Sequence, residues 1–402
     1  MIKRCFSLLA LFVILVGTAT CVHSTSVPEV LYLQDSKLID SFGKIGYGIT
    51  RQIGVNYLSL YNLYSENYTT DAILRRDFEQ FKQCGINIVA LSLYWYRLEG
   101  NTMGDYDGVY PDGSYYGERF LEQIKRVLTV ANDCGIKVLI RFHTLWGTED
   151  SPWCTPDYVI DPVTRENIGL AIVRSENMKK AFIDMFNHTV SYLAGTPGIL
   201  AWIILSEPWY WPHDLDPPYD NINQKENFLD LIQKLSNIVK NVDGRPATVE
   251  FVNTHEDENS TGGAKLENIF AEDWNWDRRI FDSLDFISLS VFLPSTEKLC
   301  DIWSNTTSEN VIGISQHNRN VWITSFGYSS DDDDDQSRHF KVMVDLFRTL
   351  PLQYGLAFFW CGDFAPAGFS EKSDEIGKGF NLCASPDGRP RPAFFTMIGD
   401  LK

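Results

Sequence analysis

Val127-Leu-Thr-Val-Ala-Asn-Asp-Cys-Gly135 is followed directly by Ile136-Lys-Val-Leu-Ile-Arg-Phe-His143, and these two segments are the main indication of the fold. The first part has the spacing of an amphipathic helix, and Gly135 stands where a helix commonly ends on a left-handed residue. The second part is apolar at nearly every position, as is typical of a parallel strand buried on both faces. An earlier stretch repeats the arrangement, since Phe78-Glu-Gln-Phe-Lys-Gln-Cys-Gly85 precedes Ile86-Asn-Ile-Val-Ala-Leu-Ser-Leu93. The repeated unit is therefore a helix, a glycine turn and a buried strand.

The same unit recurs through the rest of the chain. Further candidate strands lie at residues 53–58, 199–205, 247–252, 286–292, 320–325 and 356–360. Helical patterns fill the gaps, for example at residues 178–193, 225–239 and 337–350. Strands that alternate with helices in this number predict a closed (β/α)8 TIM barrel, in a single domain over residues 25–402. The alternative, a doubly wound open sheet, is expected to carry a Gly-rich phosphate turn after its first strand, and Gly54-Val-Asn-Tyr-Leu-Ser is not one.

The amino-terminal residues and the net charge indicate the location of the protein and the kinds of partner that it can bind. Lys3 and Arg4 precede an apolar run over residues 6–16, followed by small or polar residues, which predicts a signal peptide over residues 1–24 and a secreted protein. The alternative, a membrane anchor, needs about 20 apolar residues. The net charge of -18 disfavours nucleic acids and anionic membranes as partners. The 11 Trp, 18 Tyr and 25 Phe suit a neutral ligand that is recognised by stacking.

Cysteines and glycosylation acceptors agree with secretion. Outside the signal the cysteines are Cys84, Cys134, Cys154, Cys300, Cys361 and Cys383. An even number in a secreted chain favours disulfides, with Cys361 and Cys383 the first pair we expect. N-glycosylation triplets begin at Asn67, Asn187, Asn259 and Asn305. No cysteine or histidine cluster in the sequence has metal-site spacing.

In a parallel barrel the functional residues lie where strands end, on the carboxyl face. The predicted ends carry Asn56, Tyr57, Tyr94, Trp95, His143, Trp146, Glu207, Trp209, Trp211, Glu250, Ser290, Phe292, Ser325 and Trp360. Aromatic rings that stack on flat sugar faces, beside polar groups that take hydroxyls, would form a sugar-binding surface.

The sequence resembles glycoside hydrolase family 5 and its clan A relatives, the endoglucanases and β-mannanases. The stretches that carry the resemblance are Asn87-Ile-Val-Ala-Leu-Ser-Leu-Tyr-Trp95, Lys137-Val-Leu-Ile-Arg-Phe-His143, Gly198-Ile-Leu-Ala-Trp-Ile-Ile-Leu-Ser-Glu-Pro208, Val321-Trp-Ile-Thr-Ser-Phe-Gly327 and Gly355-Leu-Ala-Phe-Phe-Trp360. The resemblance implies that Glu207 is the general acid/base. It also places His143 and Trp360 against the sugar, and Trp95, Trp146 and Trp209 are weaker candidates for the same role.

The resemblance breaks on one side of the site. Where the family has a nucleophilic Glu at the end of the seventh strand, this chain has Ser325. The family's Arg on the second strand is Ala90, and its His and Tyr on the sixth are Ser290 and Phe292. The Asn before the acid/base, which grips the 2-hydroxyl of the sugar, is Ser206. A retaining glycosidase needs two carboxyl groups about 5 Å apart, and serine cannot replace one of them without a base.

Other carboxylates are candidate substitutes for the missing nucleophile. Glu250 ends the fifth predicted strand and Asp363 follows the eighth, and a structural role is the alternative for each. A separation of roughly 6.5–9.5 Å from the acid would suit an inverting reaction. We interpret the acidic run from Asp331 to Asp335 as a solvated loop rather than a calcium site, because spaced ligands are the usual calcium signal.

Three hypotheses follow. The first is a secreted relative of the family that binds a β-linked oligo- or polysaccharide and has impaired or lost hydrolysis. The second is an active endo-β-1,4-glycanase that uses Glu207 and an unconventional second group. The third is an interaction protein with no sugar in the cleft. No cofactor or metal is implied, and we expect a monomer with no membrane partner once the signal is cleaved.

Overall fold

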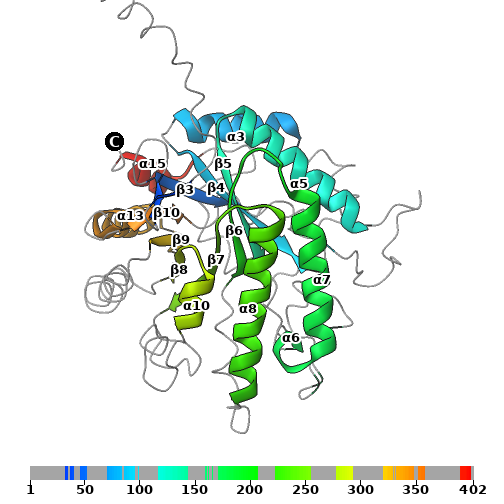
Figure 1. Ribbon diagram of the computed structural model, residues 1–402. Helices are drawn as coiled ribbons and strands as arrows, with labels where there is room; N and C mark the ends of the chain where they lie inside the picture. The colour runs from blue at the N-terminus through cyan, green and yellow to red at the C-terminus, as the bar shows by residue number, and fades with distance from the viewer. Residues whose placement is uncertain are drawn as a thin grey trace, which may run out of the picture.

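The computed structural model describes the barrel and most of its surrounding helices (Figure 1). The described residues are 32–34, 37–39, 46–51, 70–83, 86–95, 98, 116–143, 159–160, 162, 165, 171–206, 222–254, 278–292, 320–328, 330, 332–347, 352–357 and 390–399. The predicted signal peptide lies outside them.

Eight described strands pair in parallel and close on themselves in the order β10-β3-β4-β5-β6-β7-β8-β9. Their bounds are β3 Gly46–Arg51, β4 Ile88–Tyr94, β5 Lys137–His143, β6 Ile199–Ser206, β7 Ala247–Thr254, β8 Ile287–Phe292, β9 Val321–Gly327 and β10 Leu352–Ala357. A separate two-stranded antiparallel sheet joins β1 Tyr32–Gln34 to β2 Lys37–Ile39. The predicted (β/α)8-like fold is confirmed.

Helices follow most of the barrel strands and lie outside the ring (Figure 1). They are α3 Asp71–Gln83, α5 Tyr116–Asp133, α6 Ala171–Arg174, α7 Glu176–Leu193, α8 Ile222–Val242, α10 Arg278–Ser283, α13 Asp333–Phe347 and α15 Pro392–Gly399. Local chemistry fixes several of their ends. The Ser175 hydroxyl accepts a hydrogen bond from the backbone N–H of Met178 and caps α7. Gly135 follows α5 with a φ of 77°, which confirms the predicted left-handed stop before β5.

The first barrel strand was predicted too late in the chain. The position between β10 and β4 is taken by β3, whereas the predicted strand at 53–58 lies outside the described residues. The sequence of β3 is Gly-Tyr-Gly-Ile-Thr-Arg, and its two glycines remove the continuous apolar run that marked the other strands. The eighth strand also comes earlier than 356–360, since β10 ends at Ala357.

The acidic run was wrongly interpreted as a loop. Asp333, Asp334 and Asp335 form the first turn of α13, and Asp332 precedes it. Oδ1 of Asp332 accepts hydrogen bonds from the backbone N–H groups of Asp334 and Asp335. Carboxylates are stabilised at this end because a helix amino terminus carries unpaired N–H groups and a partial positive charge.

The main hydrophobic core lies between the barrel and its helices. Phe142 on β5 contacts Phe186 on α7, with ring centroids 4.6 Å apart, and stacks on Trp202 of β6. Trp95, directly after β4, is fully buried and meets Phe182 edge-on at 5.1 Å. Buried apolar surface contributes about 25 cal/mol per Å², so each of these aromatic side chains is a sizeable part of the stability.

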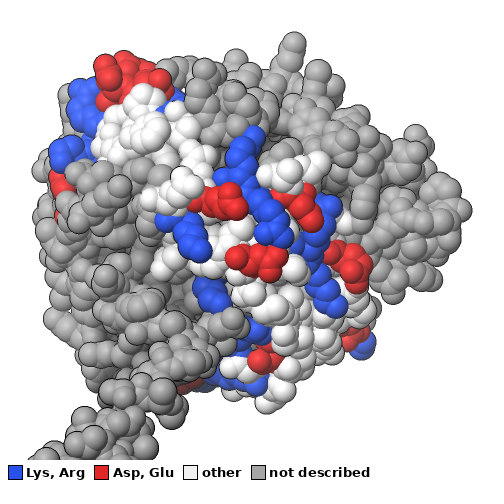
Figure 2. Space-filling view, turned by 90° about the horizontal axis from the view of Figure 1, so that it is seen from above, with Lys and Arg blue, Asp and Glu red and all other residues white. Residues whose placement is uncertain are grey.

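Ion pairs cover the helices near the top of Figure 1. Arg75 of α3 binds Asp133 of α5 at 2.7 Å, and Arg126 binds Asp71 at 3.2 Å. On the face seen in Figure 2, acidic and basic side chains alternate over the described residues. Exposed pairs of this kind contribute little to stability because solvent screens them, but they keep charge dispersed on this face.

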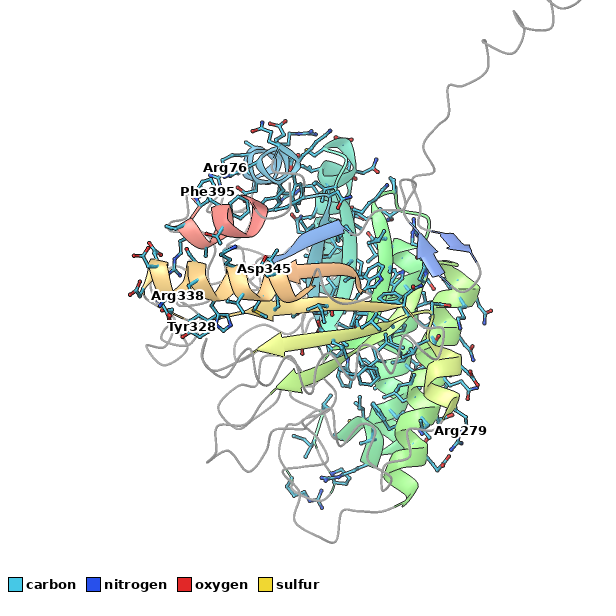
Figure 3. All side chains as sticks on the ribbon, turned by 90° about the vertical axis from the view of Figure 1, so that its left-hand side faces the viewer. Arg76, Arg279, Tyr328, Arg338, Asp345 and Phe395 are labelled. Atoms are coloured by element: carbon cyan, nitrogen blue, oxygen red, sulfur yellow. The ribbon has the colours of Figure 1, made fainter. Side chains whose placement is uncertain are left out.

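The helix after β9 is tied to the last described helix. Arg391 binds Asp333 at 2.7 Å and donates to the backbone carbonyl of Ser330. His339 of α13 is fully buried and stacks on Tyr328, with ring centroids 3.8 Å apart. Tyr328 and Arg338 lie at the same end of α13 in Figure 3, with Asp345 toward the other end. Burial lowers the pKa of His339 to about 4, although Asp335 acts in the opposite direction.

Cys134 corrects part of the cysteine prediction. It is a free, buried thiol, so the six cysteines do not all pair with one another, and burial raises its pKa. The other five, including Cys361 and Cys383, lie outside the described residues. Of the predicted glycosylation acceptors, Asn187 is exposed on α7, while the other three lie outside the described residues. Among the described helices, none has the length and apolar character needed to cross a bilayer.

Candidate functional site

The interior of the barrel changes character along the strands. A second apolar cluster, separate from the main core, gathers residues close to the strand beginnings: Ile88, Ala90, Leu139, Leu200, Ala201, Ile203, Phe286 and Trp322. Phe286 and Trp322 form its centre, with ring centroids 4.2 Å apart. Nearer the carboxyl ends, the buried side chains become polar. Those that the structure describes are Arg141, Ser206, Glu250, Ser290, Thr324 and Ser325, while the buried residues Thr248 and Ser288 lie near the beginnings of β7 and β8.

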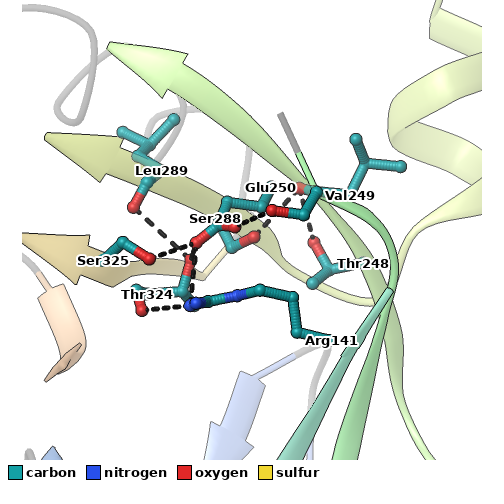
Figure 4. A network of polar contacts seen from close by, with 9 residues as sticks. Arg141, Thr248, Val249, Glu250, Ser288, Leu289, Thr324 and Ser325 are labelled. Carbon is teal, nitrogen blue, oxygen red and sulfur yellow. Dashed lines mark hydrogen bonds and ion pairs between the residues drawn. The ribbon is translucent and has the colours of Figure 1, made fainter. Parts of the chain in front are cut away.

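Glu250 is the centre of this polar group (Figure 4). Its Oε1 atom lies 3.0 Å from Nη2 of Arg141, and both side chains are fully buried. The same oxygen accepts hydrogen bonds from the hydroxyls of Thr324 at 2.6 Å and Ser325 at 2.9 Å. Its Oε2 atom accepts one from the Ser206 hydroxyl at 2.6 Å. Glu250 therefore gathers donors from β5, β6 and β9 around a single carboxylate.

Two irregularities in the sheet bring these donors together. Along β9, Ile323 pairs with Leu289 and Ser325 pairs with Ser290, so Thr324 is an extra residue in the strand. Bulges of this kind change the direction of side chains and are common near active sites. As a result, two consecutive hydroxyls, those of Thr324 and Ser325, reach Glu250 from one strand.

A similar shift occurs in β6. Ile203 pairs with Thr248 on β7, but the next pairing is Leu205 with Val249, which leaves Ile204 as the extra residue. Ser206 then comes into register with Glu250, its hydrogen-bond acceptor. Without the shift, the alternation of faces along the strand would direct Ser206 away from the interior.

Arg141 completes the group by supplying its positive charge. Its Nη2 atom donates to the backbone carbonyl of Thr324 at 2.6 Å as well as contacting Glu250. A charge buried alone in a barrel would cost several kcal/mol, so each of the two residues depends on the other. The pair itself carries no net charge.

The four donors define what Glu250 can do chemically. Three of these donors converge on Oε1 and one reaches Oε2, so the two lone-pair sites of Oε1 are fully engaged. Glu250 is also 0% exposed. A nucleophile must reach the anomeric carbon with a free oxygen, so this arrangement favours a structural carboxylate over an attacking one.

The fold matches solved structures of glycoside-cleaving enzymes. The GH5_18 protein from Streptomyces cattleya, in complex with GlcNAc, superposes with a TM-score of 0.60 at 13% identity, over 89% of this chain and 80% of that one. The endo-1,4-beta-D-mannanase from Thermotoga petrophila gives 0.58 at 14% identity, over 89% and 99%. The endo-1,4-beta-mannanase from Rhizomucor miehei gives 0.57 at 18% identity, over 93% and 96%.

The chain has the barrel of these enzymes. Neither a protein-family model nor a curated protein matches the sequence. At these identities the likeness shows the fold alone, a (β/α)8-like barrel.

Three of the predicted site residues come together in the barrel. Ser206 and Ser325 both donate to Glu250, and Ser290 is in register with Ser325 on the neighbouring strand. Trp95 does not join them, since its indole packs in the main core against Phe182.

The remaining predicted site residues fall outside the described part of the site. His143 is the last residue of β5, and its side chain is not among those that the structure describes. Glu207, Asn56, Trp146, Trp209 and Trp360 lie outside the described residues, as does Asp363.

Sequence reasoning missed the role of Arg141 and Thr324. A signal was present, because Arg141 and Glu250 are the charged residues that interrupt two otherwise apolar strand interiors, and their charges are opposite. Opposite charges in two buried strands of one barrel predict an ion pair. Among the described residues, no cluster of His, Cys, Asp and Glu could hold a metal ion.

Proposed function

We propose that this chain is a secreted protein that binds a β-linked glycan at the carboxyl end of its barrel and does not hydrolyse it through a pair of carboxylates. The proposal rests on the residue at position 325 and on its hydrogen bond. A serine hydroxyl stands there, and it donates to a buried carboxylate instead of being activated by a free base.

The geometry around Ser325 supports the loss of a nucleophile. Serine attacks only when a neighbouring base takes its proton and a site is open to the substrate. Here the acceptor of that proton is Glu250, which is already bound to Arg141, Thr324 and Ser206. Ser325 is itself 1% exposed. The hydroxyl therefore helps hold the barrel interior rather than facing a scissile bond.

The fold and the sequence support a glycan as the ligand. The chain has the barrel of proteins whose structures are complexes with GlcNAc and with Manβ1-4GlcNAc. In the resemblance, His143, Trp360 and Glu207 line the sugar subsite. Secretion is supported by the basic and apolar start of the chain and by the exposed acceptor Asn187.

The test is sugar release from a panel of soluble β-glucans and β-mannans, with oligosaccharide binding measured by calorimetry. Wild type would be compared with Glu207→Gln and Ser325→Glu. We expect no turnover from any of the three and oligosaccharide binding by the wild type. Robust wild-type turnover that disappears in Glu207→Gln would overturn the proposal in favour of an active endo-β-glycanase. Absence of both turnover and binding would leave an interaction protein with no sugar in its cleft.

A further inference from the structure

Two fully buried polar side chains beside Glu250 have hydrogen-bonding groups that no described residue satisfies. In Arg141, Nη2 is engaged, whereas Nε and Nη1 have no hydrogen-bond partner in the described part of the chain. In Ser290, the hydroxyl is likewise without a partner there. Both residues are 0% exposed, so bulk solvent does not reach these groups. Leaving buried donors unpaired is costly, most of all on a charged group, and native proteins rarely do so.

Both residues border the same carboxylate. Arg141 touches Oε1 of Glu250 directly. Ser290 is in register with Ser325, whose hydroxyl donates to that same oxygen. The unpaired groups therefore flank one small polar region rather than lying in unrelated parts of the barrel.

The residues at this level of the barrel are small. Ser206, Ser290 and Ser325 stand here, whereas Ala90, Phe286 and Trp322 belong to the apolar cluster nearer the strand beginnings. A buried water needs two to four polar partners and room for about one probe sphere. The small polar side chains, together with the free edges of Arg141, meet the chemical part of that requirement.

We propose that the barrel interior binds ordered water beside Glu250, held by Nε and Nη1 of Arg141 and by the hydroxyl of Ser290. Nε and Nη1 point in different directions from the guanidinium carbon, so more than one water molecule is bound. The waters are part of the barrel interior. Their presence does not depend on which ligand, if any, occupies the cleft.

Water fits this site better than an inorganic anion does. Arg141 is positive, but Glu250 neutralises it at 3.0 Å, and both side chains are buried. An added anion would place a second negative charge beside Glu250 in a region of low dielectric constant. A neutral ligand that accepts and donates hydrogen bonds meets the same groups without that penalty.

Ser288 provides a matched control for Ser290. The two serines lie two residues apart on β8 and are both fully buried, but the Ser288 hydroxyl donates to the carbonyl of Val249 at 3.0 Å. Ser288→Ala removes this existing hydrogen bond and is expected to raise the unfolding equilibrium constant by roughly fivefold. If Ser290 binds water, Ser290→Ala has a similar effect. If Ser290 has no partner at all, its removal leaves that constant unchanged or lowers it, which would overturn the Ser290 part of the site.

Two direct measurements on the full chain complete the test. Oxygen-17 magnetic relaxation counts long-lived internal waters in solution, and we expect a smaller count in Ser290→Ala than in Ser288→Ala. A high-resolution crystal structure should show water oxygens about 2.7–3.2 Å from Nε and Nη1 of Arg141. Absence of such density overturns the site. A bromide soak that places an anomalous peak there overturns water in favour of an anion.

Discussion

The guanidinium of Arg141 and the carboxylate of Glu250 meet 3.0 Å apart inside the barrel, where both side chains are fully buried. The two residues come from strands that do not pair with each other, since β5 and β7 lie on either side of β6. Their contact therefore spans the interior, and it converts two charges that would each be costly into one neutral unit.

Breaking this pair from one side should be strongly destabilising. We expect Arg141→Met or Glu250→Met to lower the free energy of unfolding by about 3–5 kcal/mol, because each leaves a buried charge unpaired. The double variant Arg141→Met/Glu250→Met should lose less than either single variant, since no charge then remains. Urea unfolding at 25 °C measures all four proteins of the cycle. Losses that simply add in the double variant would contradict the coupling.

A carboxylate at position 325 should conflict with Glu250. The Ser325 hydroxyl already lies 2.9 Å from Oε1 of Glu250, so Ser325→Glu brings a second negative charge to that place. We expect this variant to be less stable than wild type by about 1–3 kcal/mol at pH 7. Adding Glu250→Gln removes the repulsion and should recover part of the loss, although it also leaves Arg141 without its partner. A double variant less stable than both single variants would argue against charge repulsion as the cause.

The buried His339 should make the protein sensitive to mild acid. Its pKa is about 4 in the folded protein, against 6.5 for an ordinary histidine, because burial disfavours the charged form. Below pH 6.5 the histidine therefore binds a proton in the unfolded chain but not in the folded chain. The free energy of unfolding consequently falls as the pH drops from 6.5 toward 4. The expected contribution is about 2 kcal/mol between pH 7 and pH 5.

Comparing variants isolates the histidine from the carboxylates. His339→Phe should lose this part of the pH dependence while keeping an aromatic ring against Tyr328. His188 is exposed on α7, so His188→Gln should retain the wild-type profile. The measurement is the change in unfolding free energy from pH 7 to pH 5 within each protein. An unchanged slope in His339→Phe would assign the acid sensitivity elsewhere.

Two glycines near β6 should respond differently to alanine. Gly198 has a φ of 93°, and an added Cβ would lie 3.0 Å from the backbone oxygen of Leu128 and 3.3 Å from Cβ of Asn132. Gly195 has a φ of 72° but no atom within 4 Å of an added Cβ. We expect Gly195→Ala to cost about 1 kcal/mol from backbone strain, and Gly198→Ala to cost about 2–4 kcal/mol from strain and overlap together. Equal losses in urea unfolding would show that the contact with Leu128 relaxes freely.

Much of the barrel could be predicted because its strands are buried on both faces. β4 to β9 appear in the sequence as apolar runs between helical patterns, and their predicted bounds agree with the structure to within one or two residues. β3 does not appear as an apolar run, because Gly46 and Gly48 interrupt its apolar character. The start of α13 was missed for a different reason. In the sequence, a run of aspartates appears self-repelling. In the structure, backbone N–H groups at the helix terminus and the side chain of Arg391 bind these carboxylates and stabilise them.

The candidate site was predictable only in part. The sequence places Ser206, Ser290 and Ser325 near strand ends, and the structure brings them to one end of the barrel interior. The ion pair that organises them depends on the bulges at Ile204 and Thr324, which set the directions of neighbouring side chains. A bulge is a property of pairing between strands, so no single strand's sequence reveals it.

The closure of the barrel has a consequence for how the chain folds as it is made. β3 and β10 are hydrogen-bonded neighbours, yet one begins at Gly46 and the other ends at Ala357. A nascent chain therefore carries unpaired strand edges on β3 and β9 until β10 has been synthesised. Contacts so distant in sequence also form slowly. Protein production should thus depend on protection of those edges during translation, and slower synthesis at lower temperature should improve the yield of folded protein.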